Sequence, residues 1–379
     1  MSNNTKTTAS QSMAFSLVDP ELKINVPSYN ENYQKNDKNY TYWGDDNKFP
    51  NKLLTLAEES PTLSSVLSGT VSFILGNGVA VEDNTSFFAR KVNKNNETIA
   101  DIVEQIAYDK LLFGGYAIQV IYNVLKQPVE IYAVPMEFIR TNRRMDRFWY
   151  NDNWGKYSTN AIIYNKFNKD EIDDSYTQIF YSKNSGSRRV YPTSPQTGAL
   201  NDIVSENIAA KYTKNSLESG LSARFIINMP NTAKLTDEQK AKIEEGIKKK
   251  FTGVDNAGTF MLYFNSTTEK LDITKVDHDN SNEIFKSIRD AARENIFIVN
   301  KATPNLFGLP TASTGFSSQE HQEAYSLYYK LVVYPIQKQI AEDLSKIIGA
   351  NVVIEPFSID LNKQDVNVVD EDTNEKITE

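Results

Sequence analysis

The spacing of apolar residues changes twice along this chain of 379 residues, and this change constrains the fold more than any other feature. Apolar residues recur at helical spacing in residues 61–113. They then form short β-branched and aromatic runs across residues 116–181, which predicts an antiparallel meander. Helical spacing returns from about residue 195. Helices followed by a sheet indicate an α+β fold class.

Local signals predict where the first helices begin and end. Ser60 followed by Pro61 is typical of a helix start, and Gly76 is typical of a helix end. Thr98 and Asp101 have the spacing of a capping box for a second helix that runs to about Phe113. The first helix should bury its apolar stripe, which comprises Leu63, Val66, Leu67, Val71 and Ile74.

A small α/β unit is predicted between two later helices. It has strands near 224–229, 259–264 and 271–276, and a helix that opens with Thr236 and Gln239 in capping-box register. At about 55 residues, such a core is marginal without neighbours. The helix before the unit carries the stripe Leu200, Ile203, Val204, Ile208 and Tyr212, and the helix after it carries Ile284, Ile288 and Ala292.

The last part of the chain combines a loop and a long helix. Residues 301–317 are rich in Pro, Gly, Thr and Ser, which predicts a loop. Ser317 and Glu320 form a capping box for a helix that should end at Gly349. Pro335 inside this helix removes one backbone hydrogen bond and predicts a kink, and residues 352–359 can form a strand.

The chain offers little catalytic chemistry. It has no cysteine, which excludes disulfides and zinc sites with sulfur ligands. His278 lies between two aspartates, but adjacent side chains point in different directions, so a polar turn is favoured over a metal site. His321 belongs to a solvated helix face on its spacing. Residues 308–315 lack the Lys-Ser/Thr of a phosphate loop. We therefore predict no catalytic residue, no metal and no cofactor.

The absence of catalytic chemistry in a chain of this length indicates a structural or interaction protein. The charge indicates either that DNA is irrelevant to it or that DNA must pass without sticking. The formal net charge is −8, so the chain as a whole repels a DNA duplex at long range instead of gripping its phosphates. No apolar run approaches the roughly 18 residues that a membrane span needs.

Six short motifs, ordered along about 300 residues, resemble the HK97-like portal proteins of tailed bacteriophages. They are W-G-D-D-N-K-F-P at 43–50, F-G-G-Y-A at 113–117, Y-P-T-S-P at 191–195, F-T-G-V-D-N-A-G at 251–258, L-F-G at 306–308 with T-G-F-S-S at 314–318, and Y-P-I at 334–336. The resemblance implies a portal fold with a wing of helices and antiparallel sheet, two stem helices, a small α/β clip and a long kinked helix. Little chain remains beyond the last strand, so the crown is small or absent.

The resemblance also implies domain boundaries. These are a flexible N-terminal arm at 1–21, the wing at 22–197, stem helix 1 at 198–220, the clip at 221–277, stem helix 2 at 278–300, the tunnel loop at 301–317, the long kinked helix at 318–349, a C-terminal wing strand at 350–361 and a flexible acidic tail at 362–379.

The implied function is a ring of usually twelve subunits at one capsid vertex, through which double-stranded DNA passes without sequence specificity. Expected partners are other copies of the chain, the terminase large subunit, the head–tail adaptor, and the major capsid and scaffolding proteins. The expected location is the virion, with the host cytoplasm during assembly. The residues expected to face DNA are Lys301, Thr303, Asn305, Thr311, Ser313 and Thr314, and those expected to dock terminase or adaptor are Lys234, Lys242, Lys249, Asp255 and Asn256.

Two other functions stay open from the sequence. The 49 acidic residues are compatible with a carboxylate-based, metal-dependent hydrolase or nuclease. Another capsid-completion protein would share the lack of catalytic motifs. A Mg²⁺-dependent nuclease assay discriminates the first, and light scattering for a stable ring discriminates the second.

Overall fold

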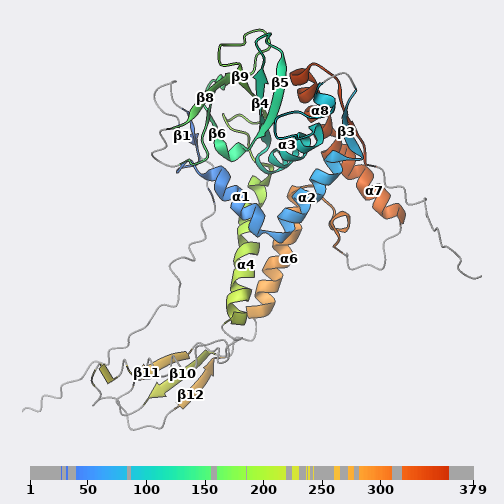
Figure 1. The fold of residues 1–379 in the computed structure, drawn as a ribbon. Helices are drawn as coiled ribbons and strands as arrows, with labels where there is room; N and C mark the ends of the chain where they lie inside the picture. Colours follow the sequence, from blue (N-terminus) through green and yellow to red (C-terminus); the bar gives the residue numbers. More distant parts are fainter. Residues whose placement is uncertain are drawn as a thin grey trace, which may run out of the picture. The chain divides into compact units, whose positions relative to one another are not determined.

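The computed structural model describes residues 27, 31–32, 40–82, 87–154, 160–184, 186–218, 224–229, 236, 238–239, 242, 260–264, 272–276, 281–309 and 318–357. The chain divides into two compact units (Figure 1). Unit 1 comprises Gly198–Ile296 with Met1–Pro27 and Leu56–Ser60, and unit 2 comprises Ser28–Thr55, Pro61–Thr197 and Phe297–Glu379. None of the described helices is both long and apolar enough to cross a bilayer.

Unit 2 is built on a six-stranded sheet with the order β5-β4-β9-β8-β7-β6. The strands are β4 (Gly115–Tyr122), β5 (Pro128–Val134), β6 (Ile139–Thr141), β7 (Arg147–Tyr150), β8 (Ile162–Lys166) and β9 (Thr177–Lys183). The sheet is mainly antiparallel, but its connectivity corrects the predicted meander. β9 returns to pair with β4, and β8 pairs with β9 in parallel. Strand spacing identifies strands, whereas these pairings depend on contacts between residues far apart in the sequence.

Three α-helices of the described chain precede the sheet: α1 (Phe49–Glu59), α2 (Pro61–Leu75) and α3 (Ile99–Phe113). The predicted bounds of α2 and α3 are confirmed, and so is the capping box between Thr98 and Asp101. Gly114 ends α3 in the left-handed region, with φ 86°. All five residues of the predicted α2 stripe are buried. Helix α1 was not predicted from the sequence, although Pro50 suits the first turn of a helix.

Two small sheets and four 3₁₀ segments complete the described part of unit 2 and its border. β1 (Glu31–Asn32) pairs with β2 (Tyr42–Trp43), and β3 (Gly78–Val81) pairs with β13 (Val352–Glu355). The predicted strand near the C-terminus is therefore confirmed, with its described end at Glu355. The 3₁₀ segments are η1 (Phe87–Ala89), η2 (Met136–Phe138), η3 (Pro195–Ala199) and η5 (Pro304–Phe307).

A buried arginine holds the segment before α1 against the sheet. The Arg140 side chain is fully buried, and its Nε donates to Asn47 Oδ1 at 2.6 Å while Nη2 donates to the Asn47 carbonyl at 2.6 Å. Its guanidinium lies 4.9 Å from the ring centroid of Trp154 and 5.8 Å from that of Trp43. Trp43 in turn stacks on Tyr191 at 4.4 Å between centroids. The 43–50 motif is thus part of the core of unit 2.

The long helix near the C-terminus is interrupted just before Pro335. It consists of α7 (Ser318–Tyr328), a π-helical segment (Tyr329–Val333) and α8 (Tyr334–Ile348). In the wider π turn the N–H of Tyr334 donates to the carbonyl of Tyr329, so Pro335 falls in the first turn of α8, where its missing N–H costs little. Gly349 ends α8 in the left-handed region, as predicted. Ser317 of the predicted capping box lies outside the described residues.

Unit 1 contains the antiparallel helices α4 (Leu200–Glu218) and α6 (Ser281–Val299), and the last residues of α6 belong to unit 2. Tyr212 stacks on Phe285 at 4.0 Å between centroids, and Asn295 Nδ2 donates to Asp202 Oδ1 at 2.9 Å.

The predicted stripes of these two helices are confirmed in part. Leu200, Ile203 and Val204 are buried as predicted, while Ile208 and Tyr212 are half-buried. In α6, Ala292 is buried, whereas Ile288 is 39% exposed. The side chain of Ile284 is not among those that the structure describes.

The small α/β unit contains the three predicted strands. β10 (Arg224–Met229) pairs in parallel with β11 (Phe260–Phe264) and in antiparallel with β12 (Asp272–Val276). The capping box is confirmed, because Thr236 N–H donates to Gln239 Oε1 at 3.0 Å and Gln239 N–H donates to Thr236 Oγ1 at 3.4 Å. Most of the helix that follows lies outside the described residues.

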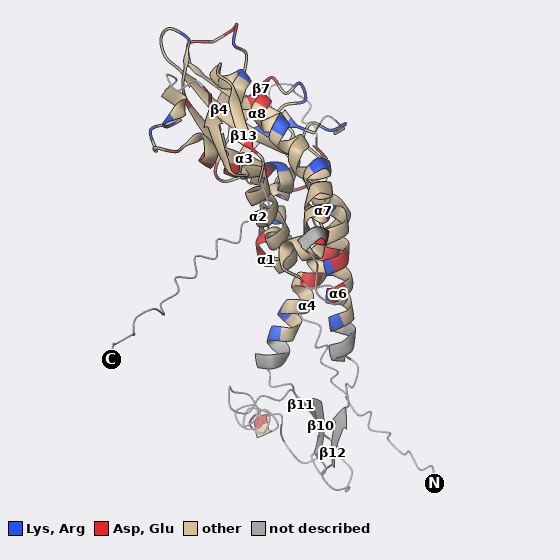
Figure 2. Ribbon diagram, turned by 90° about the vertical axis from the view of Figure 1, so that its right-hand side faces the viewer, with Lys and Arg blue, Asp and Glu red and all other residues tan. Residues whose placement is uncertain are grey.

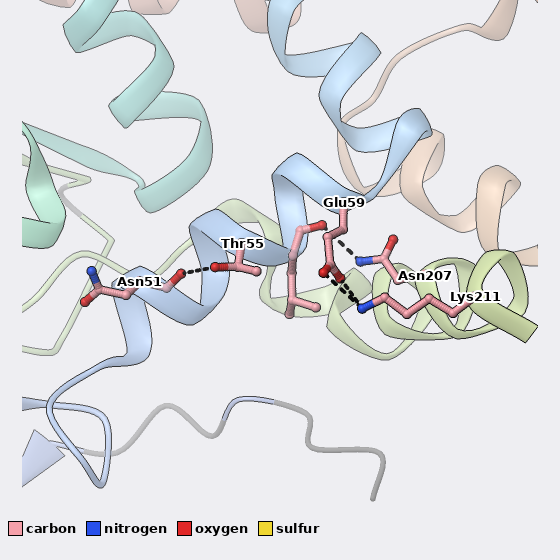
Figure 3. A network of polar contacts seen from close by, with 6 residues as sticks. Asn51, Thr55, Glu59, Asn207 and Lys211 are labelled. Carbon is pink, nitrogen blue, oxygen red and sulfur yellow. Dashed lines mark hydrogen bonds and ion pairs between the residues drawn. The ribbon is translucent and has the colours of Figure 1, made fainter. Parts of the chain in front are cut away.

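Polar contacts connect the end of α1 with α4 inside unit 1. Lys211 Nζ lies 2.8 Å from Glu59 Oε2, and Asn207 Nδ2 donates to the Leu56 carbonyl at 3.2 Å. Figure 3 shows Glu59 beside Asn207 and Lys211. A further hydrogen bond joins the buried Ser60 hydroxyl to the Glu206 carboxylate. These contacts hold the end of α1 against the middle of α4.

Candidate functional site

The structure describes the first half of the predicted DNA-facing loop. Lys301 and Thr303 lie in the turn between α6 and η5 and are exposed, and Asn305 lies in η5 and is half-buried. Thr311, Ser313 and Thr314 lie outside the described residues. The geometry of the candidate site is therefore that of the root of the loop.

The turn begins with an abrupt end to α6. Lys301 has φ 53°, and its N–H donates to the Ile298 carbonyl at 3.0 Å, while the Ala302 N–H donates to the Phe297 carbonyl at 3.0 Å. This pair of hydrogen bonds is a Schellman motif, which satisfies the last carbonyls of the helix. A lysine in this left-handed conformation costs about 1–2 kcal/mol relative to glycine, so the surrounding contacts must hold it there.

Phe307 anchors the turn through an aromatic cluster. Its ring centroid lies 6.1 Å from Phe73 of α2, 6.0 Å from Phe297 of α6 and 5.9 Å from Tyr328 of α7. Gly308, with φ 80°, then closes η5 by donating its N–H to the Pro304 carbonyl. The loop therefore leaves from a fixed point on α2 and α7.

Gly69 makes room for this anchor. A Cβ atom at Gly69 would lie 2.8 Å from Cε1 of Phe307, closer than carbon atoms approach in proteins. Glycine inside a helix costs about 1 kcal/mol relative to alanine, and the close approach of Phe307 gives its presence a physical reason. The role of Gly69 was not predicted from the sequence, and the signal that could have found it is a glycine in the middle of an otherwise apolar helix.

The same aromatic cluster also holds the segment around Phe357, which follows β13. Phe73 also lies 5.2 Å from Tyr325 and 5.6 Å from Phe357. The Tyr328 hydroxyl is 2.6 Å from Thr70 Oγ1, and the Tyr325 hydroxyl donates to the Phe357 carbonyl at 3.0 Å. Burial raises the pKa of Tyr328 to about 12, so this hydroxyl stays neutral and acts only in hydrogen bonding.

The loop is chemically suited to weak contacts with an anion. Residues 301–317 contain one lysine, several hydroxyl and amide side chains, and no carboxylate. Hydroxyl and amide groups can donate to phosphate oxygens without reading base sequence. A polyanion would therefore meet little repulsion and one cation per copy at this stretch.

The predicted docking residues are described only in part. Lys242 is exposed and lies in the helix of the small α/β unit. Lys234, Lys249, Asp255 and Asn256 lie outside the described residues, so the structure does not bring this set together.

No site for a metal ion emerges from the part of the chain that the structure describes, where three or more His, Asp or Glu side chains nowhere gather. His278 and its neighbouring aspartates are not among those residues. His321 lies in the first turn of α7 with a half-exposed side chain.

A buried lysine of unit 2 was also not predicted from the sequence. Lys110 of α3 is only 5% exposed, and its Nζ lies 5.9 Å from the ring centroid of Tyr116, with no hydrogen-bond partner among the described residues. Burial lowers its pKa to about 8, and the negative charge of Asp343 opposes this shift. Asp343 itself accepts hydrogen bonds from Tyr116 at 2.6 Å and Ser182 at 3.1 Å.

Comparisons with known proteins place the fold. A family model described as phage portal protein matches residues 74–376. No curated protein matches the sequence. The structure is similar to the neck of a native gene transfer agent particle computed with C12 symmetry, with a TM-score of 0.54, 18% identity and coverage of 83% of this chain and 85% of that chain.

A second solved structure gives the same result. The crystal structure of an HK97 family phage portal protein from Corynebacterium diphtheriae matches with a TM-score of 0.52 and 12% identity, covering 81% of this chain and 94% of that chain. These likenesses confirm the predicted α+β fold class.

Proposed function

Because the chain belongs to the phage portal protein family, we propose that its copies form a ring that conducts double-stranded DNA into and out of a capsid through one vertex. The observation that carries the proposal is the family match over residues 74–376, which includes α4, α6 and the whole loop at 301–317. The C12 symmetry of the gene transfer agent neck supports a ring of twelve, and a neighbour from a gene transfer agent virion supports a place in the particle.

Each part of the chain receives a role in this ring. Residues 22–197 and 318–361 form the wing, 198–220 and 278–300 the stem, 221–277 the clip and 301–317 the tunnel loop. The division of the chain between Thr197 and Gly198, and again between Ile296 and Phe297, supports the border between wing and stem. The antiparallel contacts of α4 and α6 support a paired stem.

Passage of DNA would be governed by electrostatics. Twelve copies at −8 each carry about −96 before counterions, which repels the duplex from most of the ring. The carboxylate-free loop is the exception, so Lys301, Thr303, Asn305, Thr311, Ser313 and Thr314 would make weak, sequence-independent phosphate contacts. Such a lining lets the duplex slide.

The remaining partners would bind at the two ends of the ring. Lys234, Lys242, Lys249, Asp255 and Asn256 of the clip would dock the terminase large subunit and later the head–tail adaptor. The wing would meet the major capsid and scaffolding proteins during assembly in the host cytoplasm. The portal family is a structural capsid component, and we expect no ATPase activity, because the motor would be the separate terminase.

Electron microscopy of the purified protein tests the ring. Negative-stain images over several protein and salt concentrations should show rings with a central hole, and static light scattering should give the mass of about twelve copies. A monomer that persists under all conditions would overturn the proposal. Mg²⁺-dependent cleavage of DNA by the pure protein would instead favour the nuclease alternative.

A charge reversal in the loop tests the contact with DNA. Lys301→Glu should still form rings, but particles assembled with it should hold at least twofold less DNA at a fixed packaging time. Lys126→Glu is the matched control, because Lys126 is also exposed and also has a positive φ, of 61°, but lies in the β4–β5 turn. Equal packaging by the two variants would remove Lys301 from the DNA path.

A further inference from the structure

One helical face of unit 2 exposes large apolar side chains that a folded monomer would bury. Leu327 is 59% exposed, Leu331 55% and Tyr334 50%. Leu327 and Leu331 are four positions apart, the spacing of neighbours on one helical face, and Tyr334 follows them at the start of α8. The opposite face of the same elements is in the core, where its buried residues are Tyr325, Tyr328, Val333 and Gln337. We call the exposed set the helix row.

A second exposed apolar pair lies in the same unit. Ile162 and Ile163 of β8 are 55% and 57% exposed. β8 pairs with β7 along residues 162–165, but its described pairing with β9 begins only at Asn165. The start of β8 therefore presents two isoleucines in the described sheet where one side of the strand has no paired neighbour. We call this pair the strand end.

The strand end and the start of the helix row belong to elements on opposite sides of unit 2. Figure 1 shows β8 on one side of the six-stranded sheet and α7 on the other, with β4 and α8 between them. A head-to-tail contact that closes into a ring requires two different surfaces of this kind on each subunit, whereas a two-fold dimer uses one surface twice.

Exposed lysines lie beside the helix row, and the loop after β8, beyond Lys166 at the other end of the strand from Ile162, has a net negative charge. Lys330 and Lys338 are exposed beside the helix row, where Lys338 makes only a long contact of 3.9 Å with Glu342. The loop that follows β8 exposes Asp170, Glu171 and Asp174 against Lys169. An apolar centre with a charged rim is the usual anatomy of a protein–protein interface.

We propose that the helix row of one subunit packs on the strand end of the next copy, with Lys330 and Lys338 facing the acidic loop after β8. This inference rests on the proposed ring and assigns the surfaces that close it. Burial of the row in the ring would also explain why the chain tolerates three large apolar side chains exposed along these helical elements.

Cysteine cross-linking tests the contact directly, because the chain has no cysteine of its own. Two double variants combine Leu331→Cys with Ile162→Cys or with Ile163→Cys. Under oxidising conditions, at least one should give a ladder of multimers on non-reducing gels, and the stronger one identifies the strand face in contact, since adjacent strand residues point to opposite faces. Each single variant should give no species larger than a dimer.

The outcomes separate this inference from the proposed function. Rings in electron micrographs without any ladder, or efficient dimers from Leu331→Cys alone, would overturn the pairing and leave the ring standing. Absence of rings from the unmodified protein would overturn the proposed function.

A second measurement uses matched substitutions on one helix. Leu331→Asp should lower the fraction of protein in rings at least tenfold, with an unchanged circular dichroism spectrum of the monomer. Gln322→Asp adds the same charge to an exposed polar position of α7 and should leave ring formation within twofold of the unmodified protein. An equal loss in both variants, or in neither, would exclude the helix row from the interface.

Discussion

Helix α2 of unit 2 differs in its charge content from the helices α4 and α6 of unit 1. The 15 residues of α2 contain no charged side chain, and seven of them are buried. The 19 residues of α4 contain five charged side chains and the 19 of α6 contain six. Figure 2 shows charged residues along the coloured part of both helices. A largely apolar helix must be buried on most of its surface. A helix with many charged residues buries only one apolar stripe and exposes the rest of its surface to solvent.

Among the side chains of the pair that the structure describes, the buried ones lie at one end. The buried apolar residues of α4 lie between Leu200 and Ala209, and those of α6 within unit 1 are Ala292 and Ile296. Because the helices are antiparallel, these stretches face each other, and the stack of Tyr212 on Phe285 marks the other end. Unit 2 therefore has a core of its own, while residues 210–214 of α4 and 285–291 of α6 contribute no fully buried apolar side chain.

Loss of Arg140 should lower the stability of unit 2 more than any other change proposed here. Arg140→Ala removes the guanidinium that donates to both the amide oxygen and the carbonyl of Asn47, and it leaves a buried gap beside these polar groups. We expect a loss of about 3–5 kcal/mol in the free energy of unfolding of unit 2. All three tryptophans, Trp43, Trp149 and Trp154, lie in unit 2, so their fluorescence during urea unfolding reports on this unit alone.

The matched control is Arg147→Ala in the neighbouring strand β7, where the side chain is exposed. Its cost should stay within about 0.5 kcal/mol. Similar costs for the two arginines would mean that unit 2 lacks the specific buried core on which the comparison depends.

Lys110 gives unit 2 an unusual dependence on pH. Its pKa is about 8 in the folded protein and 10.5 as an ordinary lysine, so between these values the unfolded chain holds a proton that the folded chain has lost. Because the unfolded chain binds more protons in this range, the free energy of unfolding should rise with pH, by up to about 3 kcal/mol above its value at pH 8. Below pH 8 the charged, buried ammonium destabilises the fold in full.

Lys110→Met tests this effect, because methionine keeps most of the length of the side chain without the charge. The variant should be more stable than the unmodified protein at pH 7.5, and the difference should shrink steadily towards pH 10 in urea titrations. Lys48→Met, at an exposed position before α1, should leave the pH profile unchanged. A constant difference for Lys110→Met across this range would show that its charge does not govern the stability.

Gly69→Ala should have an intermediate effect at the anchor of the loop. The added Cβ would push on the Phe307 ring at 2.8 Å, at a cost of about 1–3 kcal/mol for overpacking. Alanine is about 1 kcal/mol more favourable than glycine inside a helix, so the net loss in the free energy of unfolding should be about 1 kcal/mol. Ser65→Ala, an exposed change on the same helix, should stabilise by a few tenths of a kcal/mol.

A second change, Phe307→Leu, should selectively relieve the clash that Gly69→Ala creates. Unfolding of Gly69→Ala with and without Phe307→Leu, compared with Phe307→Leu alone, gives the coupling between the two positions. A coupling near zero would mean that α2 does not position the root of the loop.

Local signals explain how much of the fold was predictable. α2 and α3 were predicted to within a residue, because Ser60-Pro61 and the box of Thr98 and Asp101 act within one turn. The order of the sheet was not, because β4 pairs with a strand about sixty residues later. The exposure of Ile288 was not predictable either, because helical spacing shows that a face is apolar and does not show which element covers it.

The position of the loop at 301–317 was predictable from the sequence, but the contacts and backbone conformation that hold its root were not. The Pro, Gly and Thr content of residues 301–317 indicated a loop, and α6 does end before it. Nothing local indicated that Lys301 takes the left-handed conformation, which is more common for glycine or asparagine. The role of Gly69 also depends on Phe307, which lies far away in the sequence and on a different element.

Loss of the ion pair between Lys211 and Glu59 should have the smallest effect. The two side chains are 62% and 38% exposed, and exposed pairs of this kind contribute at most about 1 kcal/mol. Lys211→Ala should cost about 0.5 kcal/mol or less, measured as faster amide hydrogen exchange in α4, and salt at about 1 M should abolish the difference by screening. A larger loss that persists in salt would show that charge pairs, and not the apolar stretch from Leu200 to Ala209, hold α4 on the end of α1.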